Sequence, residues 1–395
     1  MRYAAITDRL AGLGSDKWAV HMRAKAMKAA GDDVILLTIG EPDIAAPPQL
    51  VEAAHAAMKA GRTGYSNGRG EPGFVEAIAA KYAGRSGRAV GNENVLCFPG
   101  TQTALYATMT GLVGIGDEVL VGDPHYATYE GVIRSAGATL VPVPLSPDNG
   151  FRMRAADVER AITPRSRLLL LNTPHNPTGA VLTRGDIEAL GAVARRHDLW
   201  IVADEVYEDL IYSGEFASPF DAPALADRTV AVASISKSHA APGFRAGWAV
   251  GPAEFCSRLL PLSETMLFGG PPFIADAAAW ALTHASTAAP AMRASYASRA
   301  ERIVAVLDRL PGVSCRLPQA GMFVLADIRR LGLTGEGFAA RLLDEARVAV
   351  MPGESFGEAL KGWVRISLTA PDAAIDAALV RIAAFVRRLA PGEAA

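Results

Sequence analysis

The segment LLLLNTPHNPTG, residues 168–179, is followed by IEALGAVARR, residues 187–196, and by LWIVAD, residues 199–204. The first and third segments each contain a short apolar run, which is typical of a strand buried on both faces. The middle segment has apolar residues at helical spacing and predicts a helix. A strand, a helix and a second strand in this order predict a parallel β-α-β unit.

The same alternation extends over the middle of the chain. Seven short apolar runs, most of them separated by helical patterns, occupy residues 95–98, 118–121, 139–143, 168–171, 199–203, 230–233 and 247–250. They predict an α/β fold with a mostly parallel seven-stranded sheet sandwiched by helices. We expect residues 45–280 to form this large domain.

The pattern changes after residue 280. A long amphipathic helix is expected over residues 299–310, and strands are expected over residues 321–326 and 363–368. We therefore expect residues 1–44 and 281–395 to form a smaller α+β domain.

Composition excludes several classes of protein. The 395 residues are 50% hydrophobic and carry a net charge of −2, which gives no electrostatic reason to expect a nucleic acid or a membrane as partner. The N-terminus has no apolar leader, so a cytoplasmic location is expected. Cys97, Cys256 and Cys315 are widely separated, which predicts buried free thiols and neither a disulfide frame nor a metal site.

Ligands of open α/β sheets bind beyond the carboxyl ends of the strands, so the turns there are informative. After residues 95–98, a small-residue turn leads into Thr101 and Gln102, where free N–H groups at a helix start would suit a phosphate. An ordinary capped helix start is the alternative interpretation.

Two further turns carry polar side chains. Asn176 stands between two prolines and could direct its amide at a ligand, although the turn is equally consistent with tight loop chemistry. Asp204 leaves a buried strand, where a carboxylate is costly unless a cation or a donor meets it. A protonated ring nitrogen would meet it, and a helix N-cap is the alternative.

The turn after residues 230–233 contains Ser234, Ser236 and Lys237, with Arg245 eight positions further on. Most lysines are solvated surface charges. This lysine stands at a strand end beside hydroxyl groups and an arginine, which together provide an amine nucleophile and a phosphate clamp. All the turns together match the needs of pyridoxal 5′-phosphate.

Five motifs, taken in order and spacing, resemble the fold-type-I, class I/II aminotransferases, with a closer likeness to arginine–pyruvate transaminases in the Trp18/His21 segment and around Lys237. They are Gly40-Glu41-Pro42-Asp43, His175-Asn176-Pro177-Thr178-Gly179, Asp204-Glu205-Val206-Tyr207, residues 234–247, and Val364-Arg365-Ile366-Ser367.

The resemblance implies a role for each cofactor residue. Lys237 would bind the cofactor's aldehyde carbon and then act as the base. Asp204 would keep the ring nitrogen protonated, Asn176 and Tyr207 would bind the ring's 3′-oxygen, and Tyr126 would stack on the ring. The phosphate would be held by Thr101, Gln102, Ser234, Ser236 and Arg245, and by Tyr65 of the neighbouring subunit of a homodimer.

The resemblance also implies a substrate site. Arg365 would bind the substrate α-carboxylate bidentately, helped by the Gly40 N–H and by Asn176. Trp18 would contact the substrate or simply pack its helix. Residues 44–47 and 67–70 depart from the family pattern, which makes the family's substrate preference uncertain for this chain.

The activity implied is ping-pong transfer of an amino group from an L-amino acid to pyruvate or 2-oxoglutarate. Arginine–pyruvate transamination is one form of this activity. The alternatives are an aspartate aminotransferase-like enzyme and a carbon–sulfur β-lyase on the same scaffold. A more remote alternative is a pyridoxal-phosphate-binding regulatory module. Such regulators carry an added N-terminal DNA-binding module, and the motifs here begin near Trp18, too early for one.

Overall fold

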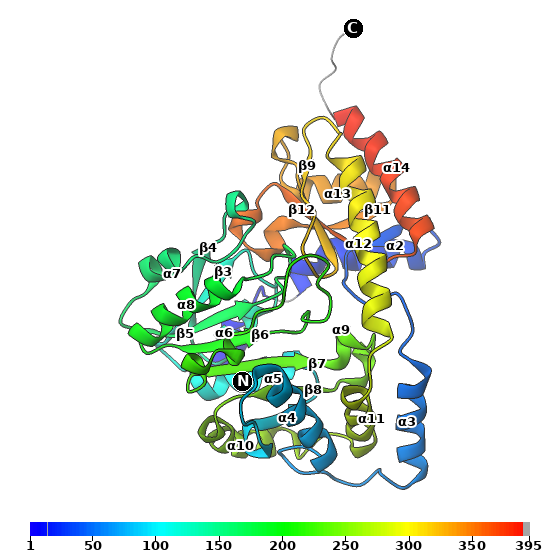
Figure 1. Cartoon of the computed structure of the whole chain (residues 1–395). Coiled ribbons are helices and arrows are strands. Elements are labelled where there is room, and N and C mark those ends of the chain that lie inside the picture. The colour runs from blue at the N-terminus through cyan, green and yellow to red at the C-terminus, as the bar shows by residue number, and fades with distance from the viewer. Residues whose placement is uncertain (14, 390–395) are drawn as a thin grey trace.

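The computed structural model describes residues 1–13 and 15–389 of the chain. Figure 1 shows a larger lower part around β5, β6 and β7 and a smaller upper part around β11 and β12. The helices are α1 (Ala5–Arg9), α2 (Ala19–Ala29), α3 (Pro48–Lys59), α4 (Pro72–Ser86), α5 (Thr101–Leu112), α6 (Tyr129–Ser135), α7 (Ala155–Ala161), α8 (Arg184–Arg196), α9 (Ile235–Ser238), α10 (Ala253–Leu267), α11 (Pro272–Thr283), α12 (Ala288–Leu307), α13 (Gly335–Ala346) and α14 (Asp372–Leu389).

The larger sheet has seven strands in the order β2-β8-β7-β6-β5-β3-β4. Only β8 runs against its neighbours, so the prediction of a mostly parallel seven-stranded sheet is confirmed. Each predicted apolar run overlaps one strand. The strands are β2 (Val95–Phe98), β3 (Glu118–Asp123), β4 (Thr139–Pro144), β5 (Ser166–Asn172), β6 (Trp200–Asp204), β7 (Thr229–Ser234) and β8 (Gly247–Val250).

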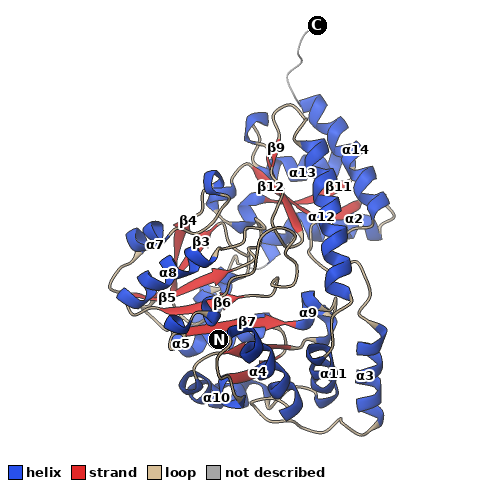
Figure 2. Cartoon of the chain, in the orientation of Figure 1, coloured by secondary structure: helices blue, strands red, loops and turns tan. Residues whose placement is uncertain are grey.

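Helices cover both faces of this sheet, as Figure 2 shows. Successive side chains of a strand point to opposite faces, and they enter different hydrophobic clusters. Leu168 and Leu170 of β5 pack in one cluster with residues of α5, α6 and α10. Leu169 and Leu171 pack in another cluster with residues of α8. Burial on both faces explains why the strands appear in the sequence as unbroken apolar runs.

The smaller sheet has five strands in the order β1-β11-β12-β10-β9. The predicted strands at residues 321–326 and 363–368 correspond to β10 and β12, whereas the other three strands were not predicted. Only β1 and β11 pair in parallel. The strands are β1 (Ile35–Leu37), β9 (Ser314–Cys315), β10 (Phe323–Asp327), β11 (Val348–Pro352) and β12 (Trp363–Ser367).

The bounds expected for the helix at residues 299–310 are wrong. This helix, α12, begins at Ala288 and ends at Leu307. Pro290 lies in its first turn, where the missing N–H costs no hydrogen bond. Pro311 disfavours helical geometry in the residue before it, which accounts for the earlier end. The domain boundaries near residues 45 and 280 stay a prediction.

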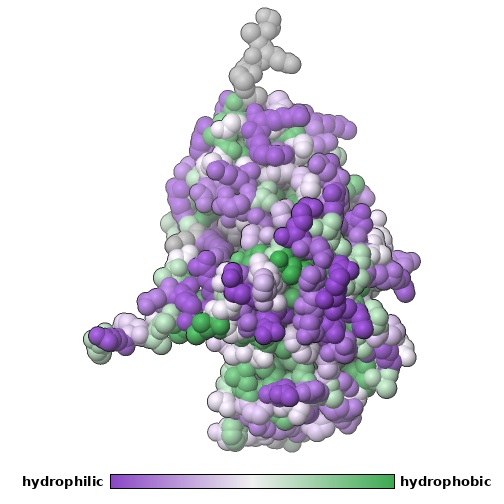
Figure 3. Space-filling view, turned by 90° about the vertical axis from the view of Figure 1, so that its left-hand side faces the viewer, coloured by the Kyte–Doolittle hydropathy of each residue, from purple (hydrophilic) through white to green (hydrophobic). Residues whose placement is uncertain are grey.

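Several smaller features complete the description. Cys256 and Cys315 are buried, whereas Cys97 is partly exposed, contrary to the expectation of three buried thiols. Within residues 1–13 and 15–389, no helix has the length and apolarity to cross a bilayer. Helix α1 contains no buried residue. Figure 3 shows a narrow arm extending from the body, at the level where Figure 1 marks the N-terminus.

Candidate active site

A cavity of about 200 Å³ lies beyond the carboxyl ends of β5, β6 and β7. It is at this end of an open α/β sheet that ligands bind. Tyr65 is the only predicted site residue that does not line it. The predicted residues that line it are Trp18, Gly40, Thr101, Gln102, Tyr126, Asn176, Asp204, Tyr207, Ser234, Ser236, Lys237, Arg245 and Arg365.

Lys237 lies in the short helix α9, directly after β7. Its Nζ donates a hydrogen bond to the carbonyl oxygen of Gly40 at 2.6 Å. Burial lowers the pKa of Lys237 to about 8, with Arg245 and Arg365 acting in the same direction and Glu41 opposing them. About a tenth of the amine is therefore neutral at pH 7, and a nucleophile or a base acts in that form.

Asp204 ends β6 and is almost completely buried. The Tyr129 hydroxyl donates to its Oδ2 at 2.7 Å, and the Val206 N–H donates to its Oδ1 at 3.2 Å. Burial raises the pKa of Asp204 to about 6, and these two hydrogen bonds limit the rise. No cationic side chain of the described residues pairs with Asp204, so a cation from a ligand would meet an unneutralised carboxylate.

Asn172 fixes the turn that carries Asn176. Its Oδ1 accepts the Asn176 N–H at 2.7 Å, and its Nδ2 donates to the Asp204 carbonyl oxygen at 3.0 Å. The turns after β5 and β6 are thereby joined. Burial raises the pKa of Tyr207, and a hydrogen bond with the Asn176 side chain opposes this. Asn176 and Tyr207 thus present adjacent polar groups to the cavity.

The start of α5 forms a cradle for an anion. Gly100 precedes it at φ 84°, and a Cβ atom there would lie 2.2 Å from Arg245 Nη2. Thr101 Oγ1 is buried without a hydrogen-bond partner. Ser234 Oγ accepts the Ser236 N–H at 3.3 Å, which leaves its own O–H free to donate. The cradle therefore offers more donors than the described chain uses, as a bound phosphate requires.

Arg365 extends from β12 and is 1% exposed. Its Nη1 donates to Asn176 Oδ1 at 3.0 Å and its Nη2 to the Thr38 carbonyl oxygen at 2.7 Å, while its Nε has no hydrogen-bond partner. The guanidinium carbon lies 3.7 Å from the ring centre of Phe323 and 4.3 Å from that of Phe356. Burial lowers the pKa of Arg365 to about 9. A buried guanidinium without a carboxylate partner is a site for an anion.

Trp18 and Tyr65 differ in their position relative to the cavity. Trp18 lines the cavity and also packs against a hydrophobic cluster, so both interpretations of it are consistent with its position. Tyr65 is 90% exposed, and its ring meets that of Phe268 edge-on at 5.3 Å. Tyr65 therefore takes no part in the cavity of its own chain.

Sequence reasoning missed residues that complete the cavity. Asn172 was missed because its bond to Asp204 forms only when the neighbouring strands β5 and β6 are brought together. Tyr129 was missed because its bond to Asp204 depends on how α6 packs. Phe323 was missed because its closeness to Gly40, where a Cβ would lie 2.4 Å from its Cζ, has no local signal. The other additions to the lining are Ile39, Leu105, Val206 and Pro242.

Comparisons with known proteins agree with this geometry. The family model for aminotransferase class I and II matches residues 32–382. An arginine–pyruvate transaminase of Pseudomonas aeruginosa is 45% identical, over 93% of this chain and 94% of that protein. An aspartate/prephenate aminotransferase of Thermus thermophilus is 35% identical, over 94% of this chain and 95% of that one. The solved structure of Thermus thermophilus aspartate aminotransferase with maleate matches with a TM-score of 0.91 at 34% identity, covering 97% and 100% of the two chains.

Proposed function

Because the chain belongs to the class I and II aminotransferases, we propose that Lys237 is the catalytic residue of a transaminase for L-arginine and pyruvate. The protein is a pyridoxal-phosphate enzyme that moves amino groups between amino acids and 2-oxo acids. One observation carries the assignment of roles: the Lys237 amine, the Asp204 carboxylate and the Arg365 guanidinium line one cavity.

The residues of the cavity fit the cofactor. Thr101 has a buried hydroxyl group without a partner, and Gly100 leaves the space that the Arg245 guanidinium occupies. The phosphate would be held by Thr101, Gln102, Ser234, Ser236 and Arg245. When bound, pyridoxal phosphate supplies an aldehyde for an amine and a cationic ring that stabilises negative charge at the substrate's α-carbon.

Each remaining side chain then has a task. Lys237 Nζ holds the cofactor between turnovers, removes the substrate's α-proton when released, and returns a proton. Asp204 would accept the hydrogen bond of the ring nitrogen and so keep that proton in place. Asn176 and Tyr207 would bind the ring's 3′-oxygen, and Tyr126 would supply an aromatic face to the ring.

Arg365 binds the substrate α-carboxylate. Its Nε has no partner in the described chain, and its Nη atoms bond only to uncharged oxygens, so two parallel hydrogen bonds to a carboxylate are open to it. The Gly40 N–H and Asn176 help to bind the same carboxylate. Trp18, which directly precedes α2, contacts the substrate.

The choice of L-arginine rests on the likeness to the Pseudomonas enzyme. Asp204 is the only acid among the described residues that line the cavity, and it is engaged with the ring nitrogen in this proposal. The test is a panel of amino acids assayed against pyruvate and 2-oxoglutarate. We expect arginine with pyruvate to react fastest, whereas faster turnover of aspartate would overturn this choice. Release of pyruvate and a thiol from cystathionine would instead favour the β-lyase.

We also propose a cytoplasmic homodimer in which Tyr65 reaches the phosphate site of the neighbouring subunit. The 90% exposure of Tyr65 and the 67% exposure of Phe268 beside it support this assembly. Sedimentation would give the mass of the assembly, and a monomer that binds the cofactor at full affinity would contradict it.

The role of Lys237 has a direct test. Borohydride reduction of the loaded protein, followed by peptide mapping, should label residue 237 and no other lysine. The Lys237→Ala protein should lose transaminase activity and remain folded. A label elsewhere, or normal turnover by Lys237→Ala, would overturn the assignment.

A further inference from the structure

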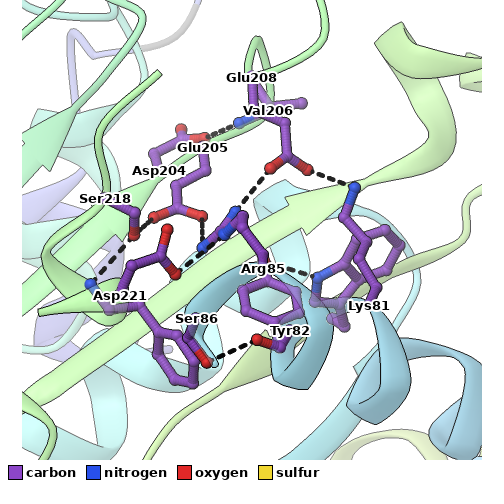
Figure 4. A network of polar contacts seen from close by, with 12 residues as sticks. Lys81, Tyr82, Arg85, Ser86, Asp204, Glu205, Val206, Glu208, Ser218 and Asp221 are labelled. Atoms are coloured by element: carbon purple, nitrogen blue, oxygen red, sulfur yellow. Dashed lines mark hydrogen bonds and ion pairs between the residues drawn. The ribbon is translucent and has the colours of Figure 1, made fainter. Parts of the chain in front are cut away.

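The turn that carries Asp204 and Tyr207 has a second face, which points away from the cavity. There a group of partly buried charges, which we call the Arg85 cluster, joins α4 to this turn, as Figure 4 shows. The cluster consists of Lys81, Arg85, Glu205, Glu208 and Asp221.

One guanidinium organises the three acids of the cluster. Arg85 Nη1 donates to Glu208 Oε2 at 2.6 Å and its Nε donates to Asp221 Oδ1 at 3.0 Å. Its Nη2 forms an ion pair with Glu205 Oε2 at 2.9 Å. The Arg85 guanidinium also lies 4.6 Å from the ring centre of Tyr82. Nε and Nη1 are thereby held by hydrogen bonds and Nη2 by the ion pair alone, an arrangement that a lysine could not reproduce.

The cluster and the cavity share the same five residues of backbone. Asp204 and Tyr207 line the cavity, and the residues that directly follow them, Glu205 and Glu208, bind Arg85. The Glu205 N–H donates to the Val232 carbonyl oxygen at 2.9 Å, so the turn is also tied to β7. A shift of Glu205 or Glu208 therefore moves a cavity residue with it.

Holding α4 against the turn does not by itself require charges. Glu205 is 0% exposed, and removing a carboxylate from water is costly even when it is paired. Apolar residues of similar volume often give equal or greater stability in such places. Charge-assisted hydrogen bonds add a defined direction, which apolar contacts lack.

We propose that Arg85 is a positioning residue that sets the places of Asp204 and Tyr207 against the cofactor ring. The proposal rests on the roles assigned above to these two residues. It assigns to Arg85 no contact with cofactor or substrate.

The test is Arg85→Lys, with Arg228→Lys as the matched control. Arg228 also bonds to two acids, Asp227 at 3.0 Å and Asp198 at 3.4 Å, and its side chain is 16% exposed against 19% for Arg85. It precedes β7, at the end of the sheet opposite the cavity. Four properties are measured: cofactor affinity of the cofactor-free protein, the pH dependence of the bound cofactor's absorbance, the kcat and KM values, and the thermal unfolding temperature.

We expect Arg85→Lys to weaken cofactor binding about tenfold, to shift the pH midpoint of the cofactor's absorbance, and to lower kcat more than it raises KM. Arg228→Lys should lose less thermal stability, because its two acids are largely exposed, and should keep the wild-type absorbance midpoint and affinity. If Arg85→Lys changes only the unfolding temperature, the cluster is structural and the proposal is overturned.

A milder variant covers the case in which Arg85→Lys does not fold. Glu208→Gln keeps the shape of the side chain and weakens its bonds to Arg85 and Lys81. It should shift the absorbance midpoint in the same sense, and a wild-type midpoint in this variant would overturn the proposal. Borohydride labelling of residue 237 in each variant separates this outcome from a failure of the proposed function, because the label reports cofactor attachment alone.

Discussion

Two arginines of this protein, Arg85 with 19% of its side chain exposed and the fully buried Arg365, have opposite surroundings. Arg85 forms ion pairs with three carboxylates and hydrogen bonds with two of them. Arg365 bonds to an amide oxygen and a backbone carbonyl oxygen and lies between two aromatic rings. Burial lowers the pKa of both. The acids around Arg85 outweigh this effect and raise its pKa, whereas the pKa of Arg365 falls to about 9. The chain neutralises the first arginine itself, whereas in the proposed function a substrate neutralises the second.

The largest expected effect comes from removing the unneutralised arginine. Arg365→Met should lower kcat/KM for the amino donor about 1000-fold, in line with the loss of a buried, charge-assisted pair. Cofactor affinity should stay near the wild-type value, because the proposed function places Arg365 in the substrate site. Steady-state kinetics and absorbance titration measure the two quantities. A loss smaller than tenfold would mean that another group binds the carboxylate.

Stability should separate the two arginines in the reverse order. Arg85→Met leaves three carboxylates without their shared cation and should lower the unfolding free energy by about 3 kcal/mol. Arg365→Met leaves no charge behind and should cost clearly less. Urea unfolding of the cofactor-free proteins makes the comparison. If the two variants lost equal amounts of unfolding free energy, Arg365 would have to be neutralised by a counter-ion in the cofactor-free protein.

Asp204 resembles Arg365 in being met by uncharged partners of its own chain, and Tyr129→Phe tests how far that resemblance goes. The substitution removes the 2.7 Å hydrogen bond to Asp204 and should raise the pKa of that carboxyl further. Cofactor affinity should fall about tenfold, the size expected for a hydrogen bond to a charged group. Tyr212→Phe, which removes a bond to the Gly321 carbonyl oxygen, is the control and should bind normally.

The smallest effect concerns the pH dependence of cofactor capture. The pKa of Lys237 is lowered to about 8, so its amine is mostly charged below that pH and mostly neutral above it. Only the neutral form attacks an aldehyde, and the capture rate of the cofactor-free protein should therefore rise about fivefold from pH 7 to pH 8. Stopped-flow absorbance measures this rate. A capture rate that does not change between pH 7 and pH 8 would contradict a Lys237 pKa of about 8.

The larger sheet was predictable because its strands are buried on both faces. Residues such as Leu168 to Leu171 form unbroken apolar runs for that reason. The smaller sheet was harder. Strand β9 has two residues and β1 has three, too few to show a period. The start of α12 was missed because Pro290 and the serines near it resemble a loop.

The candidate site was predictable where a residue follows a strand end or belongs to a motif. Asp204 is the last residue of its strand, Lys237 and Asn176 lie shortly after theirs, and a parallel sheet brings such ends together. Tyr129 lies at the start of α6, and its bond to Asp204 depends on how that helix packs. The Arg85 cluster joins residues as far apart as 81 and 221, which no local pattern reveals.

The contacts of Arg365 also bear on when the enzyme is complete during synthesis. Its Nη2 bonds to Thr38, which lies 327 positions earlier in the chain. A growing polypeptide contains Thr38, Asn176 and Lys237 long before the ribosome adds Arg365. The lysine that we propose as the cofactor's anchor is therefore made well ahead of the arginine that we propose for binding the substrate carboxylate. On this proposal, an unfinished chain lacks its carboxylate-binding group until strand β12 emerges.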